Sequence, residues 1–189
     1  MKSKKIPVNQ YITDELDLIE DFYEYSQEYL LLIGTVIVYF NSLESNLDQL
    51  ICNIICDRTD RTGLLVLHNM SFIAKVNLYD RLRREEMQCF NWNNGALAFN
   101  NVISKLKCCG TKRNRIVHTN WQYLDNDGYQ QVRFCIGKKG LEQEFMQLDI
   151  ASLKRIIEEI EKVSLEIDEF EEEFDYQCEL KYLEATKAP

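Results

Sequence analysis

The spacing of hydrophobic residues predicts that helices form most of this chain. Apolar side chains recur every three or four positions over long stretches, which places them on one face of an amphipathic helix. This pattern covers residues from about 27 to 56, 72 to 86, 96 to 118 and 150 to 183. An earlier helix is expected to begin at Thr13, a capping residue that two acidic residues follow.

Two of the predicted helices carry a charged residue on the face that should contact the core. Glu44 interrupts the apolar series that runs from Ile33 to Ile54, and Arg113 interrupts the series from Phe99 to Val117. A buried charge requires a partner, so one interpretation is a structural ion pair between Glu44 and Arg113. This interpretation is compatible with a functional Arg113, because Glu44 would then hold the arginine in its working orientation.

Residues 121–148 follow a different pattern, which predicts a small antiparallel β-meander. Apolar and polar residues alternate, at least in part, over 121–124, 129–136 and 141–148. Turn-forming sequences separate these segments at 125–128 and 137–140. The packed face of the meander is expected to carry Val132, Phe134 and Ile136.

Length and charge limit the classes of protein that fit this pattern. A chain of 189 residues suits a single domain, residues 1–189, with residues 1–12 expected to be flexible. The net charge of −9 excludes a protein that coats nucleic acid with its whole surface, but it allows a local basic site. The acidic residues of the last helix, including Glu171 to Glu173, are expected to form a solvated face.

The cysteines and the apolar segments predict a cytoplasmic protein without a membrane span. There are seven cysteines and no Cys-x-x-Cys pair, so we expect reduced thiols. Cys52 and Cys56 lie one helical turn apart but lack a second pair of ligands, which favours core packing over a metal site. The apolar stretch from Tyr29 to Phe40 is short for a membrane span, and Gly34 and Thr35 interrupt it.

One part of this acidic chain contains no acidic residue. Between Glu86 and Asp125 the charged side chains are all basic, namely Lys105, Lys107, Lys112, Arg113 and Arg115. A phosphate ligand needs such a segment, because carboxylates nearby would repel it. We expect Lys107, Lys112 and Arg115 to contact RNA, although Lys112 and Arg115 fit a solvated surface equally well.

The end of the predicted helix 96–118 combines groups that suit phosphodiester cleavage. Asn114 and His118 lie four residues apart on one face, and the neighbouring Arg113 is long enough to reach the same ligand. A histidine can act as general base or acid at neutral pH, and an arginine can stabilise the charge on phosphorus. Taken alone, His118 near a helix C-terminus fits a residue that interacts with the last carbonyls. One chain supplies one such histidine, so the reaction predicts a two-fold dimer.

The sequence Arg113-Asn114-x-x-x-His118 resembles the R-x4-6-H motif of HEPN domains, in which a polar residue often follows the arginine. Phe40-Asn41-Ser42-Leu43-Glu44 resembles the first long helix of bacterial members, which carries an acidic or polar residue facing the motif. The resemblance covers residues 27 to 120 and the final helix. It implies an all-α, antiparallel helical bundle, with the β-meander as an insertion before the long C-terminal helix.

The resemblance also implies an activity. Catalytic HEPN proteins are dimeric, metal-independent endoribonucleases, often toxins or effectors of phage defence, and they need no cofactor. Arg113 and His118 would be catalytic with support from Asn114, RNA would be the partner, and an antitoxin protein is possible. Toxins paired with nucleotidyltransferase antitoxins often carry a tyrosine two residues from the histidine, whereas Asn120 stands there in this chain. Other HEPN domains are catalytically inactive, so a dimerisation or interaction module is the alternative function.

Overall fold

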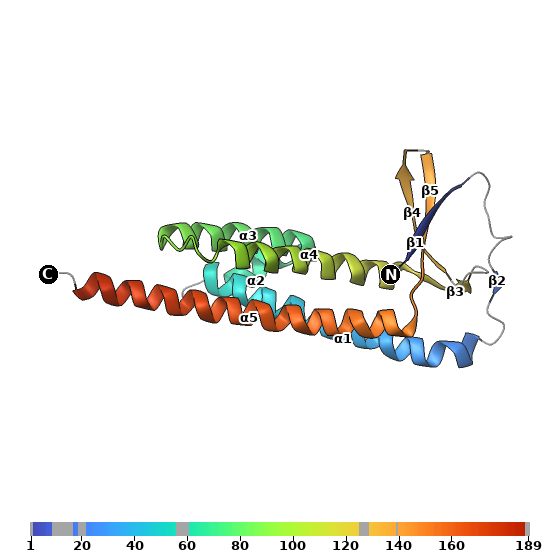
Figure 1. The fold of residues 1–189 in the computed structure, drawn as a ribbon, viewed down its shortest axis with the longest axis horizontal. Coiled ribbons are helices and arrows are strands. Elements are labelled where there is room, and N and C mark those ends of the chain that lie inside the picture. The colour runs from blue at the N-terminus through green and yellow to red at the C-terminus, as the bar shows by residue number, and fades with distance from the viewer. Residues whose placement is uncertain are drawn as a thin grey trace. The chain divides into compact units, whose positions relative to one another are not determined.

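The computed structural model of the protein describes residues 2–8, 17–18, 22–55, 61–124, 129–138 and 140–187. Within these residues the helices are α1 (Phe22–Ile55), α2 (Arg61–Leu67), α3 (Phe72–Cys89), α4 (Ala96–His118) and α5 (Ile150–Lys187) (Figure 1). The strands are β1 (Ser3–Pro7), β2 (Asp17–Leu18), β3 (Asn120–Leu124), β4 (Gln130–Gly137) and β5 (Gly140–Met146). The prediction of a mainly helical fold with a small antiparallel sheet is confirmed.

The chain divides into two compact units. We call Met1–Val38 with Thr111–Glu158 the sheet unit, and Tyr39–Gly110 with Glu159–Pro189 the helical unit. The boundaries fall inside α1, α4 and α5, so each of these helices contributes to both units. The sequence prediction of one domain stays a prediction.

The helical unit has an aromatic and aliphatic core. The Phe40 ring lies 4.6 Å from that of Phe72, and Phe99 lies 5.6 Å from Tyr79 and 5.0 Å from Phe170, between ring centroids. Such tilted and stacked pairs add to the free energy gained from burying the rings. The residues of this core belong to α1, α3, α4 and α5, which therefore pack together as a bundle.

Two helix pairs in this unit are antiparallel. The start of α3 contacts α4 at Gly110, where α4 leaves the helical unit, because a Cβ at Gly110 would lie 2.8 Å from the Phe72 ring. The other end of α3 meets the start of α4, where Arg84 donates to Asn100. Lys105 pairs with Glu166 while Phe99 packs on Phe170, so residue numbers rise along α5 as they fall along α4. The short connection Phe90–Gly95 allows the first of these antiparallel arrangements.

The hydrophobic spacing identified most of the buried faces correctly. Phe40, Leu47 and Ile51 of α1 are buried, as are Phe99, Ile103 and Leu106 of α4. At the end of α4 the prediction is wrong by one position, because Ile116 is buried and Val117 is 40% exposed. Ser71 caps α3, since its hydroxyl accepts from the Ala74 N–H at 3.3 Å.

The sheet unit contains one antiparallel sheet with the strand order β1-β5-β4-β3-β2. The predicted meander forms β3, β4 and β5, and Gly137 pairs with Gly140 across the β4–β5 turn. Gly140 has a φ of +94°, a left-handed conformation that glycine adopts without strain. The predicted turn at 125–128 lies outside the described residues. Val132, Met146 and Leu148 form the core beneath the sheet, together with the partly buried Trp121.

The N-terminal residues differ from the sequence prediction. Residues 1–12 were expected to be flexible, but Ser3–Pro7 form β1 and pair with β5, from Ser3 opposite Met146 to Pro7 opposite Glu142. The helix expected from Thr13 is wrong at Asp17–Leu18, which form β2 and pair with β3, while residues 13–16 lie outside the described residues. Backbone pairing with distant strands therefore outweighs the local helical pattern.

The packed face of β4 also differs from the prediction. Val132 is buried, but Phe134 is 48% and Ile136 is 89% exposed. The register between β4 and β5 shifts between Gln131 and Arg133. The residues on the other face of β4 are not buried either, since Arg133 is exposed and Cys135 is partly buried. This end of β4 therefore lies beyond the core that Val132 joins.

Helix α1 bears on the predicted absence of a membrane span. Gly34 and Thr35 lie inside this helix, and Thr35 donates its hydroxyl hydrogen to the Leu31 carbonyl at 2.8 Å. Among the described residues, Ser26–Ile55 is one helix that is long and apolar enough to cross a membrane by length and composition alone. A core helix of a soluble protein that is mostly buried passes the same test; here Val36, Phe40 and Leu43 are buried, but the buried share of the apolar window is 22%. The absence of a membrane partner and the cytoplasmic location stay predictions.

Candidate functional site

The motif residues lie on the last two turns of α4, within the sheet unit. Asn114 and His118 are both exposed, and their spacing of four residues places them on one face of the helix. Arg113 is partly buried and donates from Nη1 to the Asn114 Oδ1 at 3.1 Å. The three side chains are therefore grouped at one helix end, with the guanidinium oriented by the neighbouring amide.

The carbonyls at this helix end are occupied by donors other than His118. The Thr119 hydroxyl donates to the Arg115 carbonyl at 2.7 Å, and the Trp121 Nε1 donates to the Ile116 carbonyl at 3.0 Å. The Thr119 N–H also donates to the Ile116 carbonyl, at 3.3 Å. Among the residues that the structure describes, the His118 imidazole forms no hydrogen bond. The imidazole therefore remains accessible to a ligand, and the capping alternative loses support.

A buried carboxylate fixes this helix end to the sheet. Glu144 of β5, whose side chain is 3% exposed, forms an ion pair with Arg115 at 3.3 Å, Nη2 to Oε1. Its other oxygen, Oε2, accepts from the Arg133 Nε at 2.7 Å. Arg115 thus has a structural partner, and its predicted contact with RNA stays a prediction. The connection places the motif next to β4 and β5 rather than on an isolated helix.

The charges around Glu144 keep it ionised. Burial alone would raise the pKa of this carboxyl, but the hydrogen bond from Arg133 and the positive charges of Arg115 and Lys5 lower it below its usual value. An ionised Glu144 is the state that holds both arginines. The geometry of the motif helix is therefore maintained across the neutral pH range.

The remaining predicted residues are divided between the two units. Glu44 accepts from the Lys75 Nζ at 2.8 Å, and Asp48 accepts from the same ammonium at 2.8 Å. Lys75 is buried, so burial alone would lower its pKa, but these two hydrogen bonds raise it. Glu44 thus neutralises a lysine of its own unit, and its pairing with Arg113 stays a prediction. Lys107 lies in the helical unit and Lys112 in the sheet unit, both partly buried.

Sequence reasoning missed Glu144, Arg133 and Trp121 as supports of the motif. In β5, Glu144 follows Gln143 and precedes two apolar residues, Phe145 and Met146. A carboxylate next to apolar residues in a strand signals a buried charge with a partner. The partner was not identifiable, because Arg115 lies in another element and nothing local connects the two.

The site offers acid–base and anion-binding groups. An exposed imidazole exchanges protons readily, and an arginine with an amide at its side can bind a phosphate oxygen. Within the described ranges, no group of three or more His, Cys, Asp or Glu side chains is arranged to hold a metal ion. A single copy supplies one His118, whereas cleavage of a phosphodiester requires both a base and an acid.

Comparisons of the chain with models of known protein families, with characterised proteins and with solved structures gave no match. The resemblance to HEPN domains therefore depends on the motif residues themselves. It remains a prediction, which the geometry of the end of α4 allows to be tested residue by residue.

Proposed function

We propose that this protein is an endoribonuclease of the HEPN type, which cleaves RNA without a metal at a site shared by two copies of the chain. One observation carries the proposal: an exposed His118 and an exposed Asn114 share a helix face, and a partly buried Arg113 is hydrogen-bonded to that asparagine. These are the groups that the resemblance assigns to catalysis. Their accessibility is what a reaction with a polymeric substrate requires.

In the proposed reaction the ribose 2′-hydroxyl is the nucleophile. His118 of one copy removes its proton, and the 2′-oxygen forms a bond to the adjacent phosphorus. Arg113 stabilises the negative charge that develops on the phosphoryl oxygens, and Asn114 orients the guanidinium. His118 of the second copy donates a proton to the 5′-oxygen as its bond to phosphorus breaks. The products carry a 2′,3′-cyclic phosphate and a 5′-hydroxyl.

The proposal is tested by incubating the purified protein with end-labelled RNA in the presence of EDTA. We expect cleavage that leaves a 2′,3′-cyclic phosphate. His118→Ala should reduce the rate by about 10²- to 10⁴-fold, the contribution typical of general acid–base catalysis. His68→Ala is the matched control, because His68 is the other histidine and is also exposed. Products with a 3′-hydroxyl, or equal losses in both variants, would contradict the mechanism.

The shared site also predicts that the activity per chain depends on the protein concentration. Activity per chain should fall when the protein is diluted below the dissociation constant of the dimer, because the monomer lacks one of the two histidines. Analytical ultracentrifugation over the same range measures the fraction of dimer. A constant activity per chain in a solution of monomers would contradict the shared site while leaving a nuclease possible.

A second candidate function is a catalytically inactive HEPN-like module for dimerisation. One observation favours it: Arg115 and Lys105, two basic residues of the acid-free segment, are neutralised by Glu144 and Glu166 of the same chain. Basic residues in such pairs serve the fold. Under this function a range of RNAs would remain uncleaved, while substitutions at the end of α4 would change the dimer constant.

A further inference from the structure

One carboxylate of the sheet unit is surrounded by more positive charge than it can neutralise. The Oε1 of Glu144 pairs with Arg115 of α4, and its Oε2 accepts from Arg133 of β4. In the register of the sheet, Arg133 lies opposite Glu144 on one side of β5, and Lys5 of β1 lies opposite it on the other. Residues opposite each other in antiparallel strands share a face of the sheet. Three cations therefore surround one carboxylate.

The buried cations of the helical unit show the opposite balance. Within the described residues of that unit, each of the two pairs with two carboxylates, namely Lys75 with Glu44 and Asp48, and Arg83 with Glu86 and Glu171. A cation with a structural role is compensated in this way inside its own unit. The surplus of positive charge around Glu144 is left for an anion from outside the chain.

Arg133 is oriented by Glu144, yet its terminal nitrogens remain available. Its Nε donates to the carboxylate at 2.7 Å, and its side chain is 52% exposed. In the part of the chain that the structure describes, Nη1 and Nη2 have no hydrogen-bond partner. These nitrogens carry the other N–H donors of a planar fork that matches phosphate oxygens. Lys5 is also exposed, so both cations can contact a ligand in solution.

The cluster lies next to the candidate catalytic residues. Arg115 and His118 are three residues apart on α4, a spacing that makes side chains neighbours on a helix surface. Glu144 connects Arg115 to the strands that carry Arg133 and Lys5, and all five residues belong to the sheet unit. Adjacent strands are about 4.8 Å apart, so the backbones of β1 and β4 are about 10 Å apart across β5. The cations therefore form a surface that begins beside His118.

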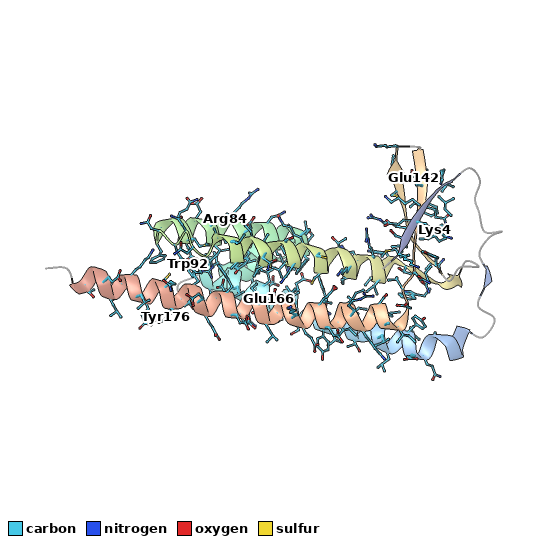
Figure 2. All side chains as sticks on the ribbon, in the orientation of Figure 1. Lys4, Arg84, Trp92, Glu142, Glu166 and Tyr176 are labelled. Atoms are coloured by element: carbon cyan, nitrogen blue, oxygen red, sulfur yellow. The ribbon has the colours of Figure 1, made fainter. Side chains whose placement is uncertain are left out.

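The nearest acidic residue on this face of β5 is directed away from the cluster. Glu142, labelled in Figure 2, lies opposite Cys135 of β4. Its carboxylate lies over Gly137, where it would clash with a Cβ. Gly137 is at the turn end of β4, whereas Arg133 is four residues earlier in the strand. The carboxylate therefore leans toward the β4–β5 turn, and the surface close to α4 stays basic.

We propose that Lys5 and Arg133 bind phosphate groups of the RNA on either side of the bond that His118 cleaves. The inference rests on the proposed function, because that function supplies RNA as the ligand. Contacts with phosphates position a nucleic acid without reading its bases. The surface therefore selects RNA by its length rather than by its sequence, and it binds a long RNA more tightly than a dinucleotide.

The binding test is the fluorescence anisotropy of a labelled 2′-O-methyl RNA of about 12 nucleotides, which lacks the attacking hydroxyl and stays intact. Lys5→Gln should raise its dissociation constant about fivefold, the upper range for an exposed ion pair. The slope of log affinity against log salt should become shallower by about 0.7, the value for one phosphate contact of a single strand. Arg133→Gln should act in the same direction, with its folding checked by circular dichroism because it also removes a partner of Glu144.

The matched control is Lys162→Gln, which removes the same charge from a 73% exposed lysine of the helical unit. This variant should bind the RNA as the wild type does. An unchanged affinity and salt slope in Lys5→Gln, or equal weakening in Lys162→Gln, would overturn the proposal. Binding to vesicles of an anionic phospholipid that depends on Lys5, without binding to RNA, would assign the surface to a membrane and also overturn it.

Cleavage assays separate this inference from the proposed function. Lys5→Gln should raise the KM for long RNA more than it changes kcat, because Lys5 holds RNA outside the reacting phosphate. Cleavage with the wild-type KM in Lys5→Gln would contradict the phosphate contacts and leave the nuclease in place. Binding of RNA that depends on Lys5, without cleavage of any RNA, would support the phosphate contacts and contradict the nuclease.

Discussion

Arg115 in the last turn of α4 forms an ion pair with Glu144 in the middle of β5, at 3.3 Å from Nη2 to Oε1. Arg133 in β4 reaches the other oxygen of the same carboxylate. The helix that carries His118 is thereby fixed to two adjacent strands. The predicted β-meander is therefore part of the framework that positions the candidate site.

Replacement of Glu144 should destabilise the sheet unit. In Glu144→Gln, the amide keeps the shape but loses the charge that two arginines share. We expect the free energy of unfolding to fall by about 1–3 kcal/mol, the range for a lost charged hydrogen bond at a buried site. Urea unfolding followed by circular dichroism measures this change. Glu142→Gln is the control on the same face of β5, and an equal loss there would show that the arginine pairs contribute nothing.

The stability difference between the wild type and Glu144→Gln should depend on pH. The folded-state pKa of Glu144 is below its usual value, so its contribution is present above the unfolded-state pKa, about 4.3, and disappears as the pH falls through the folded-state pKa. We expect a constant difference between pH 7 and about pH 5.5 and a smaller one below about pH 4. Urea titrations at several pH values measure it. A difference that increases on acidification would contradict the assigned ionisation.

The stability contribution of Glu171 should change with pH in the direction opposite to that of Glu144. Burial raises its pKa, although Arg83 and Tyr79 lower it in part, so its contribution is present below the unfolded-state pKa and is lost as the pH rises through the raised value. Relative to Glu171→Gln, the wild type should therefore become more stable as the pH is lowered from neutral to about 4. The same urea titrations test this. A wild type that loses stability relative to the variant over this interval would show that Arg83 outweighs burial.

The side chains that surround Glu171 lead to a further prediction about stability. The Glu171 carboxylate accepts from the Tyr79 hydroxyl and from Arg83, whose guanidinium lies 4.4 Å from the centroid of the Phe174 ring. Arg83→Met should cost about 3–5 kcal/mol, because a buried carboxylate loses its counter-charge. Adding Glu171→Gln to this variant should restore part of that loss. Thermal unfolding measures both, and Arg81→Met at an exposed position is the control.

Gly110 should resist substitution despite its position inside a helix. Alanine is about 1 kcal/mol better than glycine in a helix interior, but a Cβ at Gly110 would lie 2.8 Å from the Phe72 ring. That ring also packs on Phe40, so we expect overpacking to dominate and Gly110→Ala to destabilise by about 1–2 kcal/mol. Chemical denaturation measures the change. The same substitution in a Phe72→Leu background should cost less, and Ser104→Ala at an exposed position of α4 should stabilise slightly.

The elements predicted from the sequence are those specified by local patterns. The helices α1, α3, α4 and α5 and the three meander strands were identified because their hydrophobic periodicity extends over many residues. The strand β1 is short and basic, and it exists because β5 offers an edge to pair with.

The errors have a common physical origin in distant contacts. Glu171 was assigned to a solvated face with its acidic neighbours, but Tyr79 and Arg83 of α3 surround it in the fold. Phe134 and Ile136 were assigned to the core, but both are exposed, because β4 continues beyond the core that Val132 joins. The motif residues themselves were found from their spacing, whereas Glu144 was missed because its partners come from other elements.

The pairing of β1 with β5 has a consequence for how this protein folds during its synthesis. Ser3 is made before its partner Met146, which follows about 140 residues later in the chain. Contacts so distant along the chain form slowly, because a long loop must close before any hydrogen bond forms. The helical unit likewise lacks its part of α5 until Glu159 and the residues after it have been made. During synthesis β1 therefore stays without its β5 partner until the ribosome has passed residue 146.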